Sequence, residues 1–159
     1  MVVTSSRKHA KRYKDAFDKY LKEKDYKGIG VLVAFSGEVE DGGQKFTEKN
    51  MNDLRGQDIR DVFNTDEYNV LLVAEKFQTG FDQPLLHSMY VDKKLQGLRA
   101  VQTLSRLNRI HPDKEDTFIL DFVNDPEEIQ KAFAVYYEDA MIPGEIDPNV
   151  LYDFRAKMD

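Results

Sequence analysis

Residues 68–123 carry the pattern that decides the fold, and they read YNVLLVAEKFQTGFDQPLLHSMYVDKKLQGLRAVQTLSRLNRIHPDKEDTFILDFV. Three runs in this stretch are apolar without a polar alternation, which is typical of buried strands: Val70–Ala74, His87–Val91 and Phe118–Phe122. A turn-rich loop, Phe77–Pro84, separates the first two runs, and an amphipathic helix, Leu98–Ile110, separates the last two. Strands that alternate with helices predict a parallel sheet.

The segments before and after this stretch continue the same alternation. Val2–Val3 and Val31–Phe35 are predicted as further strands. A helix between them is indicated by apolar residues at helical spacing, with Ser5 or Ser6 as its N-cap: Ala10, Tyr13, Phe17 and Tyr20. Asp125-Pro126 is a strong helix start, and Pro143-Gly144 is expected to end that helix. The predicted fold class is α/β, a three-layer α/β/α sandwich with a mainly parallel sheet.

Two segments give weaker signals. Ser36–Thr47 contains three glycines and alternating charges, and we predict a mobile surface loop there. Residues 50–63 are weakly helical, with Gly56 lowering the helix propensity.

Composition limits the protein class. The chain has 159 residues, 33% of them charged, a net charge of -6 and no cysteine. We therefore expect one globular domain over residues 1–143, followed by an extension over 144–159 that leads toward a further domain. The strand at Val2 has no linker before it, which suggests a piece of a longer chain. No apolar run is long enough to span a membrane and no secretory leader is evident, so a cytoplasmic protein is expected.

Arg106 and Arg109 stand out as candidates for binding phosphate. Each guanidinium is always charged and donates in a planar fork, and the spacing of three places both on one helix face. The alternative is that they are ordinary surface arginines near a helix C-terminus, where the helix dipole favours them.

Polar segments follow the predicted strands, where α/β proteins bind ligands. They include Thr4–Arg7, Thr79–Asp82, Asp92 and Asp121. Thr4–Arg7 is equally explained as a helix cap, and Thr79–Asp82 as a turn. Asp82, Asp92 and Asp121 could instead form an acidic magnesium pocket, whereas the three histidines have no metal-ligand spacing. The sequence contains no phosphate loop of the form G-x-x-x-x-G-K-[ST].

Three motifs in order resemble those of the second RecA-like lobe of superfamily two helicases. QTLSRLNR (102–109) resembles motif VI, with Ser105 where many members have glycine. LLVAEKFQTGFD (71–82) resembles motif V, with Thr79 where many members have arginine, and VVTSSR (2–7) resembles motif IV. VAFSG (33–37), KFQTGFDQPLLHSMYVDKKL (76–95) and AVQTLSRLNR (100–109) are especially similar to the motor subunit of type I restriction-modification enzymes. The resemblance covers residues 2–123.

The resemblance implies one lobe of an ATP-dependent DNA translocase and endonuclease that works with modification and specificity subunits. ATP and Mg²⁺ would be held mainly by the first RecA-like lobe, so this chain alone would not hydrolyse ATP. Arg109 would be the arginine finger and Arg106 its partner on the phosphates. Nucleotide-binding roles fall to Gly80, Asp82 and Gln102. Contacts to the backbone of double-stranded DNA fall to Thr4, Ser5, Ser6, Arg7 and Thr79.

Two rival interpretations stay open at this level. One is the equivalent lobe of another superfamily two motor, such as a repair helicase. The other is an α/β module that binds a nucleotide or a protein partner without any motor role.

Overall fold

The computed structural model describes residues 1–77 and 81–140, with side chains as far as residue 137 in the last helix. Within these residues, parallel strands form a five-stranded sheet in the order β2-β5-β1-β6-β7. The strands are β1 (Val2–Thr4), β2 (Val31–Phe35), β5 (Val70–Ala74), β6 (Ser88–Asp92) and β7 (Phe118–Asp121). The predicted α/β fold with a mainly parallel sheet is confirmed, and it is consistent with a RecA-like sandwich.

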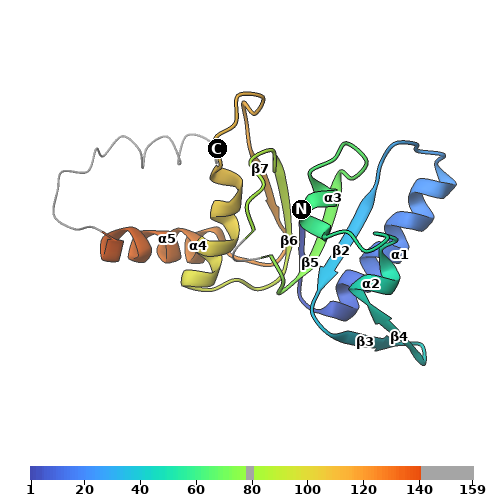
Figure 1. Ribbon diagram of the computed structural model, residues 1–159. Coiled ribbons are helices and arrows are strands. Elements are labelled where there is room, and N and C mark those ends of the chain that lie inside the picture. Colours follow the sequence, from blue (N-terminus) through green and yellow to red (C-terminus); the bar gives the residue numbers. More distant parts are fainter. Residues whose placement is uncertain (78–80, 141–159) are drawn as a thin grey trace.

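Helices cover both faces of the sheet (Figure 1). They are α1 (Arg7–Glu23), α2 (Glu48–Met51), α3 (Ile59–Phe63), α4 (Leu98–Leu104) and α5 (Pro126–Ala140), with a 3-10 helix η1 (Ser105–Asn108) after α4. α1 packs on one face through Ala10, Tyr13 and Phe17, whereas α3, α4 and α5 contribute to the core on the opposite face. The parallel strands therefore lie between two apolar layers.

The continuous apolar runs follow from this double coverage. In β5, Leu71 and Val73 belong to the core beneath α3 and α4, and Leu72 and Ala74 belong to the core beneath α1. All four side chains are at most 1% exposed. Because successive strand residues point to opposite faces, a strand buried on both faces needs an apolar residue at each position.

The coverage is less complete over β6 and β7. Tyr90, Phe118 and Leu120 are 38%, 46% and 40% exposed, and the rings of Tyr90 and Phe118 meet edge to face. Tyr90 points away from the core that buries Met89 and Val91, so this part of the face lacks a cover among the described residues.

The prediction of a mobile loop over Ser36–Thr47 is wrong. These residues form an antiparallel hairpin of β3 (Glu38–Asp41) and β4 (Gln44–Thr47), separate from the main sheet. Gly42 and Gly43 make its two-residue turn with φ of 63° and 77°. A turn with two positive φ values matches the twist of antiparallel strands, and glycine adopts it without steric cost.

The other predicted boundaries hold with local changes. The weakly helical segment over 50–63 divides into α2 and α3, since residues 53–58 are not helical. α5 begins beside Asp125 as expected, with the Asp125 carboxylate accepting a 2.8 Å bond from the Glu127 backbone N–H. The expected helix end at Pro143 and the extension over 144–159 lie outside the described residues. Among the helices that are described, none is long and apolar enough to cross a membrane.

Candidate functional site

Arg106 and Arg109 both bind the segment that follows residue 80. Arg106 Nη1 donates a 2.9 Å hydrogen bond to the Phe81 carbonyl, and Arg109 Nε lies 3.0 Å from Asp82 Oδ1. The Arg109 side chain is 50% exposed and that of Asp82 is 67% exposed. Tertiary packing therefore brings together the two motifs that the sequence places about 25 residues apart, and it leaves one guanidinium available at the surface.

The helix that carries these arginines differs from the predicted Leu98–Ile110. The α-helix ends at Leu104, the chain tightens into η1, and Arg109 has an extended backbone with φ of -79° and ψ of 128°. The prediction that both arginines project from one helix face is therefore wrong. The tighter turn keeps Leu107 buried while Arg109 turns out toward Asp82.

Lys114 fixes the chain just after Arg109, a role that no sequence pattern predicts. Its ammonium group donates to the carbonyls of Pro84, Leu107 and Arg109 at 3.1, 2.5 and 2.9 Å. Burial lowers the pKa of Lys114. A cation at this place satisfies carbonyls left open by the end of η1, so it holds Arg109 next to the loop that carries Asp82.

The residues at the carboxyl end of β1 form a second group. Ser6 caps α1 by accepting a bond from the His9 backbone N–H, and Ser5 also contacts the His9 ring. Arg7 donates to the carbonyls of Ser36 and Glu38. Ser5, Ser6 and Arg7 lie at the surface, so they remain candidates for contact with DNA.

Thr4 does not fit that role. Its side chain is 0% exposed, and its hydroxyl donates to the Val73 carbonyl at 3.0 Å. The expectation of a DNA contact from the Thr4 side chain is therefore corrected: this hydroxyl ties β1 to the end of β5.

The remaining predicted residues divide between described and undescribed parts of the chain. Gln102 is half-buried on α4, one helical turn before Arg106. Thr79 and Gly80 lie outside the described residues, so their predicted roles stay predictions.

The alternative magnesium pocket is not assembled. Asp92 accepts the Tyr13 hydroxyl at 2.9 Å, Asp82 pairs with Arg109, and Asp121 accepts the backbone N–H groups of Val123 and Asn124. In the part of the chain that the structure describes, no group of three or more histidine, aspartate or glutamate residues could hold a metal ion.

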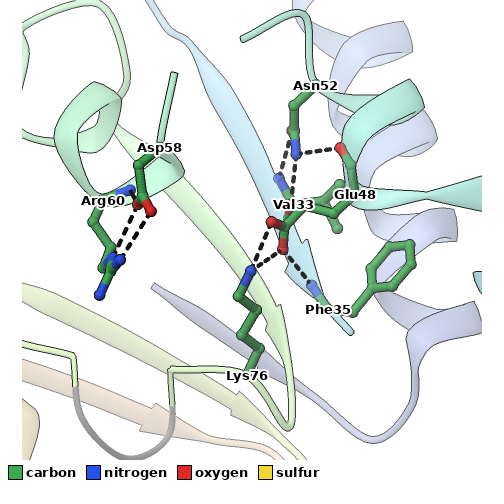
Figure 2. Close-up of polar contacts among 7 residues, drawn as sticks. All are labelled: Val33, Phe35, Glu48, Asn52, Asp58, Arg60 and Lys76. Carbon is green, nitrogen blue, oxygen red and sulfur yellow. Dashed lines mark hydrogen bonds and ion pairs between the residues drawn. The ribbon is translucent and has the colours of Figure 1, made fainter. Parts of the chain in front are cut away.

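A polar network that the sequence did not reveal lies at the edge of the sheet (Figure 2). Asn52 pairs with Val33 as a neighbouring strand would, accepting its N–H at 3.0 Å and donating to its carbonyl at 2.7 Å. The Glu48 carboxylate accepts the Phe35 N–H at 3.0 Å and binds Lys76 at 2.7 Å. Lys76 lies two residues after the end of β5, so this network joins the edge strand β2 to the part of motif V that follows β5.

The donor set suits part of a nucleotide site. Arg109 already binds a carboxylate, which shows that its guanidinium is placed to meet an anionic oxygen. The chain has no phosphate loop, and the carboxylates described above are engaged elsewhere. The described residues therefore offer a donor for an anionic oxygen such as that of a phosphate.

Comparison with known proteins places this arrangement in a family. Residues 43–124, just over half of the chain, match the family described as type I restriction enzyme subunit R domain 3. The chain belongs to the family of type I restriction enzyme R subunits. The resemblance of the motor motifs to this family is thus confirmed, and the interpretation as a lobe of a repair helicase loses its support.

Individual relatives of the R-subunit family agree with this assignment. The chain is 37% identical over 149 residues to the type I restriction enzyme MjaVIIP endonuclease subunit of Methanocaldococcus jannaschii, covering 86% of this chain and 14% of the relative. It is 29% identical over 167 residues to the MjaVIIIP endonuclease subunit of the same organism, covering 96% of this chain and 16% of the relative. The HindI endonuclease subunit of Haemophilus influenzae is 32% identical over 74 residues, which are 45% of this chain and 7% of that protein. The chain thus spans about a seventh of the length of the archaeal relatives.

Proposed function

We propose that this chain is the second motor lobe of the ATP-dependent DNA translocase within a type I restriction endonuclease. The observation that carries the proposal is the joint anchoring of Arg106 and Arg109 on residues 81–82, with Arg109 half-exposed. Phosphoryl transfer is accelerated mainly by positioning and by positive charge near the transferred group. Arg109 suits that task, because Lys114 holds its backbone carbonyl and its side chain is half-exposed.

In this proposal Arg109 is the arginine finger and Arg106 orients it. Asp82 binds Arg109 in the structure. The first lobe would hold ATP with Mg²⁺, and a phosphate oxygen would then compete with Asp82 for the Arg109 guanidinium. Arg106 fixes the loop through the Phe81 carbonyl, and Lys114 fixes the chain on the other side of Arg109. Gln102 and Gly80 would line the same cleft. The Arg109 guanidinium would thus reach the phosphate without any rearrangement of the hydrophobic core.

Contact with double-stranded DNA is assigned to the carboxyl end of β1. Ser5, Ser6 and Arg7 offer hydroxyl, backbone and guanidinium donors, which suit phosphate contacts that position the protein without reading sequence. Thr79 is included by its place in motif V. The modification and specificity subunits are the proposed partners, because the R-subunit relatives are named as subunits of type I enzymes.

Replacement of Arg109 by alanine tests the proposal in the full-length subunit assembled with its partners. An arginine finger contributes about 10³–10⁵ in rate, so we expect DNA-stimulated ATP hydrolysis to fall by at least about 10³. Stability should change little, since exposed ion pairs contribute roughly 0–1 kcal/mol. ATP hydrolysis is measured at saturating ATP, together with thermal unfolding.

Arg99→Ala is the matched control, because Arg99 is an exposed arginine in the first turn of α4. It should retain full activity. A loss below tenfold in Arg109→Ala would overturn the arginine-finger assignment and favour a non-motor binding module.

A further inference from the structure

The segment that follows β5 within motif V, residues 75–77, has a strained backbone. Glu75 and Phe77, on either side of Lys76, have φ of 63° and 64° although neither is glycine. The Lys76 N–H donates back to the Ala74 carbonyl at 2.7 Å, which closes a tight turn at the end of the strand. Left-handed backbone at non-glycine residues is disfavoured, so such a turn persists only where surrounding contacts hold it.

Glu48 supplies one of those contacts. Its carboxylate receives the Lys76 ammonium at 2.7 and 2.8 Å, and the two side chains are 21% and 30% exposed. The carboxylate is itself fixed by the Phe35 N–H, and α2 is fixed by Asn52 on Val33 (Figure 2). Lys76 is thus tied to a rigid edge of the sheet.

The contacts continue from Lys76 to the arginines. The Lys76 ammonium lies 5.0 Å from the centre of the Phe77 ring, and the Phe77 ring lies 4.9 Å from that of Phe81. The Phe81 carbonyl accepts the bond from Arg106, and the next residue, Asp82, binds Arg109. A continuous series of contacts therefore runs from α2, across the strained turn, to both arginines.

We propose that Glu48 and Lys76 are positioning residues for the arginine pair: they hold the turn at 75–77 so that Phe77 places Phe81 and Asp82 against Arg106 and Arg109. This inference rests on the proposed motor function. The two side chains lie outside both apolar core clusters, and small displacements of a catalytic group lower reaction rates strongly. Neither residue touches the nucleotide in this scheme.

The test is a double-mutant cycle in the full-length subunit assembled with its modification and specificity subunits. Glu48→Gln keeps an oxygen for the Phe35 N–H and removes the charge, and Lys76→Gln removes the cation. We expect each change to lower kcat of DNA-stimulated ATP hydrolysis roughly tenfold or more with little change in KM for ATP. The double variant should be no worse than either single one, and Lys76→Arg should restore most of the rate.

A matched control breaks another ion pair of the same length. Lys45 and Glu38 on the β3–β4 hairpin are 2.7 Å apart, and Lys45→Gln should leave kcat unchanged. Thermal unfolding of every variant is measured as well. If the pair positions the arginines, kcat falls while the unfolding temperature stays unchanged. If a variant instead has a lower unfolding temperature and regains the parent kcat when assayed well below that temperature, the inference is overturned in favour of a folding role.

The outcomes separate this inference from the proposed function. If the parent complex hydrolyses ATP and Arg109→Ala abolishes that activity, but Glu48→Gln and Lys76→Gln stay within twofold, the positioning role is rejected and the motor role stands. If Arg109→Ala has no effect, the proposed function fails, and the positioning role fails with it. Additive losses in the double variant would also reject the pair as one unit.

Discussion

Gly30, just before β2, lies close to the backbone of residues 67–68, which precede β5. A Cβ atom at this position would lie 2.0 Å from the Glu67 carbonyl oxygen and 2.8 Å from the Tyr68 ring. The Gly30 carbonyl also accepts the N–H groups of Asn69 and Val70, so the close approach is fastened by hydrogen bonds. Backbone atoms cannot move aside as the end of a flexible side chain can.

We therefore expect Gly30→Ala to destabilise the chain by about 2 kcal/mol or more, as overpacking does in well-packed sites. Urea unfolding measures the change. Gly28→Asn is the control: its φ is 77° with nothing within 4 Å, and asparagine tolerates that conformation. The explanation would be wrong if Gly30→Ala cost no more than Gly28→Asn.

Among the contacts between elements, one carboxylate of the β3–β4 hairpin, that of Asp41, binds three basic residues of α1. Asp41 contacts Lys8, Lys11 and Arg12, with Arg12 binding both oxygens at 3.0 and 3.1 Å. The Arg12 guanidinium holds the pKa of Asp41 below its ordinary value. A group of lowered pKa stabilises the folded form above its unfolded pKa, and the stabilisation is lost as the pH falls.

This clamp makes the hairpin sensitive to acid. We expect the contact between the hairpin and α1 to weaken as the pH falls below about 4, the ordinary range of an aspartate. In Asp41→Asn, the contact between the hairpin and α1 should already be weakened at pH 7, and it should change little further as the pH falls below about 4. NMR shifts of hairpin amides measure this. Glu40→Gln, the neighbouring acid on β3, should behave as the parent chain; identical pH profiles for Asp41→Asn and the parent would contradict the clamp.

At the scale of the whole molecule, the proposed site is one side of a cleft. The core is covered by helices on both faces, so we expect the 159-residue chain to fold. The sequence nevertheless lacks a phosphate loop, and the Arg109 guanidinium binds the Asp82 carboxylate. In the proposed function, the nucleotide is therefore held by another lobe.

The isolated chain is accordingly expected to show no ATP hydrolysis above a buffer blank, with or without DNA, while circular dichroism shows a cooperative unfolding transition. Arg109→Ala purified in parallel provides the control for a contaminating ATPase. ATP hydrolysis by the isolated parent chain that is absent from Arg109→Ala would contradict the half-site interpretation.

The strands of the main sheet, their parallel arrangement and the two arginines can be predicted from the amino-acid sequence alone. Strands such as Val31–Phe35 are buried on both faces, so their apolar runs reveal them directly. Arg106 and Arg109 are recognisable because the motif is local in the chain. Ser36–Thr47 was misjudged because its glycines suit a loop and a hairpin turn equally, and the register of β3 with β4 decides between them.

Which side chains meet depends on the tertiary packing. The burial of Thr4 against Val73, the pairing of Asp82 with Arg109 and the contact of Glu48 with Lys76 join residues that are distant in sequence. Local propensity carries no information about such pairs, because each partner alone is an ordinary surface or strand-end residue. Packing of the sheet and its helices brings them within hydrogen-bond distance, and that geometry turns two separate motifs into one candidate site.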